Sequence, residues 1–218
     1  QMSYICYEAQ KIGIIKELFK NNKPERVIIF TGSKIKAKEL AISLARAKFN
    51  CRAMHSDLTQ QERDEVMYLF RSAQTDILVA TDIVARGIDI DDITLVINFD
   101  VPHDAEDYVH RIGRTARAGA GGSAITLVSE KDQLEFMKIE RFLGKEVEKM
   151  TIPESLGKGP AYNPKAQDNR SNKGKRSSKG NKVGRNKINK NGHSKPPHKK
   201  NHDKPKAQQT ETQKKESK

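Results

Sequence analysis

Short apolar runs alternate with amphipathic segments along the first two thirds of the chain. The apolar runs, several of them rich in isoleucine and valine, predict strands at residues 4–7, 26–30, 51–54, 76–81, 94–99 and 123–129. Between them, apolar side chains recur at spacings of three and four, which predicts helices at residues 9–21, 36–49, 59–73, 104–112 and about 131–143. Thr59 and Glu62 have the spacing of a capping box at the start of one of these helices.

Strands that alternate with helices are typical of a mostly parallel sheet. We therefore predict an α/β domain over residues 1–150, with a doubly wound sheet and helices on both faces. In such sheets, ligands bind at the loops that leave the carboxyl ends of the strands. Unusual polar residues follow three of the predicted strands, at 31–33, 55–57 and 81–82.

The composition changes at Gly157. Residues 158–218 contain 19 lysines and arginines against 4 acidic residues, whereas residues 1–157 contain 22 against 24. Large apolar residues almost vanish from the basic segment, so it cannot bury enough surface to offset the entropy of ordering. We predict a domain over 1–150, a short linker over 151–157, and a disordered Lys/Arg-rich tail over 158–218.

The basic tail has two interpretations: a solvated linker that only aids solubility, or a non-specific tether for nucleic acid. We favour the tether, because so much positive charge would release many counterions on binding a polyanion. Tyr162 is the single aromatic residue of the tail, so base stacking contributes little. Three tail histidines at 193, 198 and 202 lack a cysteine partner, and we expect no metal site in this chain.

The two cysteines, Cys6 and Cys51, lie on apolar stretches without C-x-x-C spacing, as expected of reduced thiols in a cytoplasmic protein. No apolar run approaches the roughly 18 residues of a membrane helix. No signal peptide is visible either. We therefore expect a cytoplasmic protein with no membrane partner.

Two segments carry candidate chemistry. In "YVHRIGRTARAG", residues 108–119, arginines recur at every third position after a histidine. A solvated basic face would explain a lone arginine triplet. This run, however, follows an apolar helix start, and its glycines permit close approach by other groups. The positions concerned are His110, Arg111, Arg114 and Arg117, with glycines at 113 and 119.

The second segment is "ILVATDIVARGIDI", residues 77–90, in which a buried strand ends at Thr81 and Asp82. A hydroxyl at a strand end, near a helix N-terminus, can donate to a phosphate. Asp89 can accept from a sugar hydroxyl. Taken singly, Thr81 also fits a helix cap and Asp89 a turn acceptor.

With "VIIFTGSK" (27–34) and "QQER" (60–63), these segments resemble the C-terminal RecA-like half of a bacterial-type DEAD-box RNA helicase. The resemblance covers about residues 3–150. One position departs from the family pattern: in "MHSDL", residues 54–58, Ser56 stands where the family has glycine.

The resemblance implies roles for individual residues. Arg114 and Arg117 would reach the γ-phosphate of ATP as catalytic arginine fingers, which can be worth about 10³–10⁵ in rate. The nucleotide cleft would also involve Asp89 at the ribose, Arg86 and Gly87 beside it, and His110 and Arg111, which would couple it to a partner domain. Contacts to RNA phosphate and 2′-OH groups, without sequence readout, would lie near Thr31, Gly32, Arg63, Thr81 and Asp82.

The sequence contains neither a G-x-x-x-x-G-K-[ST] loop nor a D-E-A-D motif. The resemblance places both, with the ligands of Mg²⁺, on an N-terminal RecA-like lobe. We therefore expect the C-terminal lobe of a larger ATP-dependent RNA helicase that remodels RNA duplexes and is inactive without the other lobe. The expected cofactors are ATP and Mg²⁺, and the expected partners are RNA and the N-terminal lobe.

Two other functions stay open. A DNA helicase or translocase lobe belongs to the same superfamily, and a duplex-preference assay would separate it. A non-enzymatic RNA-binding adaptor could act through the tail, although it would not need the arginine fingers. The sequence does not decide between an RNA of ribosome assembly and an mRNA undergoing turnover.

Overall fold

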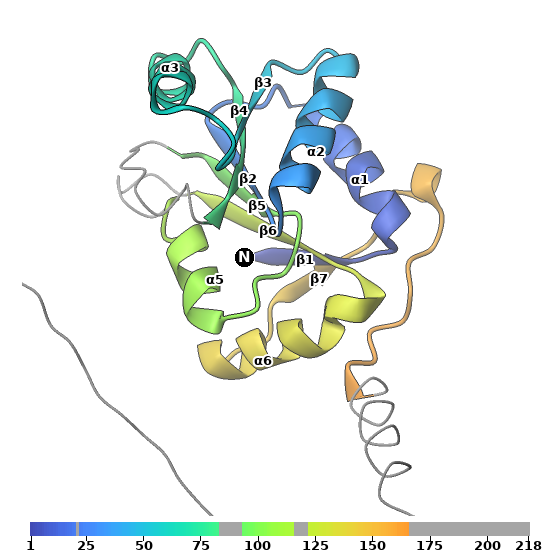
Figure 1. The fold of residues 1–218 in the computed structure, drawn as a ribbon. Helices are drawn as coiled ribbons and strands as arrows, with labels where there is room; N and C mark the ends of the chain where they lie inside the picture. Colours follow the sequence, from blue (N-terminus) through green and yellow to red (C-terminus); the bar gives the residue numbers. More distant parts are fainter. Residues whose placement is uncertain (21, 83–92, 116–121, 166–218) are drawn as a thin grey trace, which may run out of the picture. The chain divides into compact units, whose positions relative to one another are not determined.

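The computed structural model describes residues 1–20, 22–82, 93–115 and 122–165 of the 218-residue chain. Within these residues, seven parallel strands form one sheet in the order β3-β4-β2-β5-β6-β1-β7 (Figure 1). The sheet confirms the predicted doubly wound α/β fold. Its strands are β1 (Met2–Ile5), β2 (Val27–Thr31), β3 (Cys51–Met54), β4 (Ile77–Thr81), β5 (Leu95–Asn98), β6 (Ser123–Val128) and β7 (Glu148–Met150).

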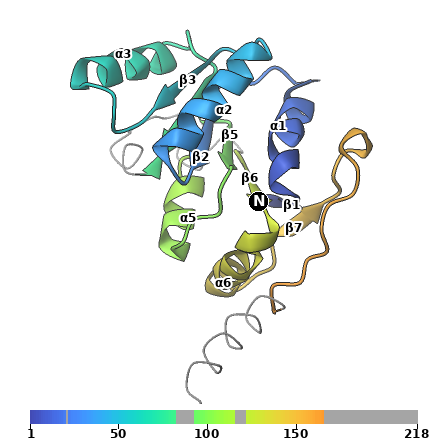
Figure 2. The same ribbon diagram turned by 45° about the vertical axis from the view of Figure 1, so that its right-hand side comes forward.

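Helices cover both faces of the sheet, as predicted (Figures 1 and 2). Ile15 of α1 and Leu40 of α2 pack with Ile29 on one face, whereas Phe70 of α3 packs with Phe30 on the other. Tyr108 of α5 and Phe136 of α6 complete the core of that second face. The helices are α1 (Lys11–Lys20), α2 (Lys34–Arg46), α3 (Gln60–Arg71), α5 (Ala105–Ile112) and α6 (Gln133–Leu143), with short 3₁₀ turns η1 (Glu8–Gln10), η2 (Glu130–Asp132) and η3 (Glu154–Leu156).

The centre of the sheet sets the position of the site. All five residues of β2 are buried, in keeping with a strand that is covered on both faces. From β2 the chain passes to β3 and β4 on one side, and from β5 it passes to β6 on the other. The carboxyl ends of β2 and β5 therefore flank the switch point, where ligands bind in sheets of this kind.

Predicted and observed element boundaries agree at the start of α3 and differ at two strands. Thr59 and Glu62 form the predicted capping box of α3, with Glu62 N–H donating to Thr59 Oγ1 at 3.3 Å. Strand β1 begins and ends two residues earlier than predicted, and Tyr7, predicted as its last residue, is instead the N-cap of the 3₁₀ turn η1. Strand β7 was not predicted, since its three residues, Glu-Lys-Met, carry no apolar pattern.

Residues 151–163, which we call the C-terminal strap, follow β7 and contact the domain. The side-chain amide of Gln133, at the start of α6, makes hydrogen bonds to the strap through both its nitrogen and its oxygen. Its Nε2 donates to the carbonyl of Ala161 at 2.9 Å, and its Oε1 accepts from the N–H of Asn163 at 2.7 Å. Between these two bonds, the Tyr162 hydroxyl donates to Glu140 Oε2 at 2.7 Å.

The strap also passes close to β1 and α1. A Cβ on Gly159 would lie 2.3 Å from the carbonyl oxygen of Ile5, so only glycine fits there without a shift. Gln10 Nε2 donates to the carbonyl of Leu156 at 2.8 Å. The contacts thus continue past the boundaries that composition predicts at residues 150 and 157, because a few apolar side chains anchor an otherwise polar segment. Most of the predicted tail, residues 166–218, lies outside the described residues.

Replacing Tyr162 tests whether the strap belongs to the fold. Tyr162→Ala should lower the free energy of unfolding by about 2 kcal/mol, because it removes ring contacts and leaves Glu140 with one donor fewer. Tyr162→Phe should cost only about 1 kcal/mol. Urea unfolding of a chain ending after Lys165 measures both, with exposed Tyr68→Ala as the control. Equal stabilities for Tyr162→Ala and the wild type would show that the strap adds nothing.

Candidate functional site

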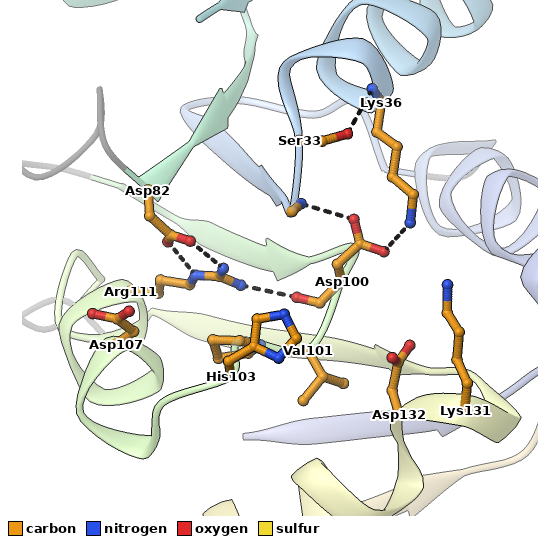
Figure 3. Close-up of a pocket in the computed structure, with 12 residues that line it drawn as sticks. Ser33, Lys36, Asp82, Asp100, Val101, His103, Asp107, Arg111, Lys131 and Asp132 are labelled. Atoms are coloured by element: carbon orange, nitrogen blue, oxygen red, sulfur yellow. Dashed lines mark hydrogen bonds and ion pairs between the residues drawn. The ribbon is translucent and has the colours of Figure 1, made fainter. Parts of the chain in front are cut away.

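A pocket of about 380 Å³ opens at the carboxyl ends of β2 and β5, at the switch point of the sheet (Figure 3). Acidic and basic side chains from α2, α5, η2 and the segments that follow β4 and β5 face one another across it. The lining residues are Gly32, Ser33, Lys36, Asp82, Asp100, Val101, Pro102, His103, Asp107, Arg111, Lys131 and Asp132.

The guanidinium of Arg111 joins three parts of this site. Arg111 lies on the last turn of α5, and only 3% of its surface is exposed. Its Nε and Nη2 donate to the two carboxylate oxygens of Asp82 at 2.6 and 2.7 Å. Its Nη1 donates to Asn98 Oδ1 at 3.1 Å and to the carbonyl of Asp100 at 2.9 Å. Four of the five N–H donors of the guanidinium are thus used, in a geometry that lysine could not reproduce.

The surroundings of Arg111 account for its burial. The guanidinium carbon lies 5.0 Å from the ring centre of Phe30, which suits a cation over an aromatic face. A charge in such a place costs several kcal/mol unless it is paired and hydrogen-bonded. The bidentate pair with Asp82 meets that condition and fixes the end of β4 against α5.

Asp100 occupies the other side of the pocket, directly after β5. Its Oδ2 accepts from the backbone N–H of Gly32 at 2.8 Å, and its Oδ1 accepts from Lys36 Nζ at 2.5 Å. Burial raises the pKa of Asp100, but the hydrogen bonds from Lys36 and Gly32 outweigh it and leave the pKa below its usual value. Asp100 was not among the predicted site residues, although its position directly after a buried strand was an available signal.

The RNA-side residues predicted on β2 and β4 lie beside this pocket. Thr31 is fully buried, and its hydroxyl donates to the carbonyl of Ser33 at 3.2 Å, so this side chain points into the protein. Gly32 is exposed, and Thr81 is half-buried. The loop after β2 therefore offers its backbone, rather than the threonine hydroxyl, to a ligand.

Arg63, the remaining predicted RNA-side residue, lies on the first turn of α3 rather than in the pocket. Its Nη2 donates to the carbonyl of Ser56 at 3.4 Å, while its Nε is buried and has no partner among the described residues. Nearby, Nδ1 of the buried His55 is also without a partner in the described part of the chain. Burial and the charges of two lysines lower the pKa of His55. The carboxylate of Asp57 raises this pKa, but it does not outweigh the other two effects. A buried N–H donor without an acceptor is a group that a phosphate oxygen would satisfy.

Two lysines that the sequence analysis did not select hold the loop beside Arg63. Lys34 Nζ lies 2.7 Å from Asp57 Oδ1, and Lys38 Nζ lies 2.8 Å from Asp57 Oδ2. Hydrogen bonds from Lys34 and Lys38 lower the pKa of Asp57 to about 2. The carboxylate therefore stays ionised and keeps both lysines at this edge.

The structure brings together some of the predicted nucleotide-side residues. Arg111 and Asp82, which were assigned to different surfaces, are bonded to each other. His110 is exposed, and Arg114 is half-buried just beyond the helix end at Gly113, with its N–H donating to the carbonyl of Arg111 at 3.2 Å. The other predicted positions, Arg86, Gly87, Asp89 and Arg117, lie outside the described residues.

The parallel sheet and its polar switch-point pocket agree with an α/β domain of the RecA-like class. Residues 10–119 match the family described as "Helicase conserved C-terminal domain". The ATP-dependent rRNA helicase RRP3 of Encephalitozoon cuniculi is 42% identical over 142 residues, which cover 65% of this chain and 36% of that protein. The eIF4A helicase of Saccharomyces cerevisiae is 39% identical over 143 residues, with coverage of 66% and 36%.

Solved structures agree. The Escherichia coli DEAD-box protein SrmB, solved bound to the regulator RraA, matches with a TM-score of 0.68 and 34% identity over 74% of this chain and 96% of that one. Dbp5 of S. cerevisiae, solved bound to RNA and ADP BeF3, matches with a TM-score of 0.64 and 33% identity, over 69% and 41%. The chain belongs to the DEAD-box RNA helicase family, as a C-terminal helicase domain. It spans about a third of the curated relatives named here, and the bacterial type stays a prediction.

One further finding concerns membranes. Among the residues that the structure describes, no helix has the length and apolar character needed to cross a bilayer.

Replacing Arg111 tests its role in holding the site together. Arg111→Ala should lower the free energy of unfolding by about 3–5 kcal/mol, because Asp82 would lose its bidentate partner. Arg111→Lys should recover little of this, since an ammonium cannot satisfy the carboxylate, Asn98 and the Asp100 carbonyl at once. Urea unfolding measures both, with exposed Arg52→Ala as the control. A Lys variant as stable as the wild type would show that the fork geometry is not required.

Proposed function

We propose that this chain is the C-terminal lobe of an ATP-dependent RNA helicase, which remodels RNA duplexes together with an N-terminal RecA-like lobe. Family membership supports the assignment. The observation that carries it is the Arg111–Asp82 ion pair, because it joins the "HRIGRTARAG" and "ATDIVARGIDI" segments at the carboxyl edge of the sheet. An RNA-binding adaptor would have no need to hold an arginine block in this way.

On the nucleotide side, we assign Arg114 and Arg117 to the γ-phosphate of ATP and Asp89 to the ribose. Phosphoryl transfer spreads negative charge over the equatorial oxygens, and guanidiniums placed there stabilise it. His110, Arg86 and Gly87 would line the same cleft. The buried Arg111 would fix the end of α5, from which Arg114 projects. ATP supplies the transferred group, and we place the Mg²⁺ ligands on the N-terminal lobe.

On the RNA side, we assign the backbone of Gly32 and the guanidinium of Arg63 to phosphates, with Thr81 beside them. The unpartnered Nε of Arg63 supports this role. Thr31 and Asp82 would act indirectly, because Thr31 is buried and the Asp82 carboxylate is engaged by Arg111. Contacts of this kind position RNA without reading its sequence.

We further propose that the basic segment 166–218 is a non-specific RNA tether, and that the enzyme works in the cytoplasm. The segment holds 17 lysines and arginines against 4 acidic residues. The location is supported by two free thiols, Cys6 and Cys51, which suit a reducing compartment.

The arginine assignment predicts the kinetics of a point variant. In the full-length enzyme, Arg114→Ala should lower kcat about 10³-fold, with little change in RNA affinity without nucleotide. Arg141→Ala, on the exposed side of α6, is the control. The 218-residue chain alone should show no RNA-stimulated ATP hydrolysis. Near-normal turnover for Arg114→Ala, or turnover by this chain alone, would count against the proposal.

The tether predicts a change in salt dependence. A chain ending after Lys165 keeps the strap and loses most of the basic segment, so its affinity for single-stranded RNA should fall. The slope of log K against log[salt] should shrink by about 0.7 for each RNA phosphate that the missing segment would have neutralised. The fall in affinity should be similar for RNAs of unrelated sequence. Binding titrations at several salt concentrations decide this, and an unchanged slope would leave the segment a solubilising role only.

A further inference from the structure

Five charged side chains form a compact group beside the loop that follows β2. Lys11 of α1 is fully buried, with its Nζ 3.0 Å from Glu8 Oε2 and 3.5 Å from Asp100 Oδ1. Lys36 of α2 lies 2.5 Å from Asp100 Oδ1 and 3.2 Å from Glu8 Oε1. Lys11 Nζ also lies 3.8 Å from Asp132 Oδ2, so two ammonium groups share three carboxylates and the buried lysine has the paired charge that it requires.

Asp100 contacts both functional segments from this group. Its side chain accepts from the backbone N–H of Gly32, at the loop assigned to RNA, at 2.8 Å. Its own carbonyl accepts from Arg111 Nη1, beside the segment assigned to ATP, at 2.9 Å. Figure 3 shows Asp100 between the loop after β2 and the Arg111 guanidinium. Lys36 lies on the side of Asp100 that is away from Arg111. One residue therefore fixes the distance between the two segments.

We propose that Asp100 is a positioning residue through which RNA at the Gly32 loop and ATP chemistry at the arginine block affect each other. The inference rests on the proposed function. If RNA moves Gly32, the hydrogen bond moves Asp100, and Asp100 carries Arg111 with it through its carbonyl. Lys11 and Lys36 keep the carboxylate ionised and aimed at the loop. Coupling between two sites is reciprocal, so each ligand should favour the other by the same factor.

The domain offers a matched control in Glu140. Asp100 and Glu140 are both 8% exposed. Glu140 Oε1 accepts from the backbone N–H of Val147 at 2.9 Å and from Lys149 Nζ at 2.8 Å, which reproduces the partners of Asp100. Glu140 lies on α6 beside the strap and does not line the pocket. Substitution at Glu140 therefore removes a similar buried carboxylate without touching either segment.

The test compares Asp100→Ala, Asp100→Asn and Glu140→Ala in the full-length enzyme. Two factors are measured: the rise in ATP turnover at saturating RNA, and the gain in RNA affinity caused by a non-hydrolysable ATP analogue. Asp100→Ala should lower both about tenfold, within the usual range for coupled sites. Asp100→Asn keeps an oxygen for Gly32 N–H and should retain most of the coupling. Glu140→Ala should leave both factors unchanged.

Hydrogen exchange in the 218-residue chain separates this inference from the proposed function. Asp100→Ala should speed amide exchange at Gly32 but not at Val147, and Glu140→Ala should do the reverse, because each truncation removes the acceptor of one of these N–H groups. Unchanged Gly32 exchange, wild-type factors in Asp100→Ala, or an equal loss in Glu140→Ala would each overturn the positioning role. If the wild-type enzyme shows no RNA-stimulated ATP hydrolysis, the proposed function is wrong and the coupling fails with it. Amide exchange at Gly32 would still report the hydrogen bond between Gly32 and Asp100 in that case.

Discussion

The carboxyl edge of this domain depends on one buried cation, the guanidinium of Arg111. A charge that is 97% removed from solvent is tolerated only where its donors are met, and the nearby acceptors come from Asp82 just after β4, from β5 and from the loop after β5. Meeting those donors draws the three segments together. The arrangement is rigid because the guanidinium is planar and its bonds lie in fixed directions.

The topology explains why the charges gather here. Strands β2 and β5 are neighbours, yet the chain leaves them toward opposite sides of the sheet, so no crossover covers the gap between their carboxyl ends. Polar groups can enter such a gap without displacing the core. Asp100 and Gly32 meet there. Lys11 of α1 and Lys36 of α2 supply the positive charges that pair with the Asp100 carboxylate. The sheet order thus makes an exposed glycine loop and a buried arginine neighbours.

The sequence predicts the elements of this fold well, because buried parallel strands and amphipathic helices leave strong periodic patterns. It predicts less about the pairings. Nothing in the spacing of Asp82 and Arg111 shows that they are bonded, since that depends on how α5 packs against β4. Asp100 could have been found from its place after a buried strand. Lys11 could not, because a lysine on an amphipathic helix is normally solvated, and here only the tertiary arrangement buries it.

The same limit applies to the strap, whose polar composition hides its contacts. A few side chains such as Tyr162 are enough to hold it, because α6 supplies Gln133 and Glu140 as partners at the right spacing. Composition averages over a segment, whereas docking depends on individual residues within it.

The outer strands of the sheet affect how copies of this domain behave at high local density. Strands β3 and β7 form the two edges and are only four and three residues long, with Arg52, Glu148 and Lys149 among them. Long apolar edges invite pairing with strands of other molecules, and short charged ones discourage it. Copies of the domain crowded together would therefore stay separate folded units rather than join sheet to sheet into aggregates.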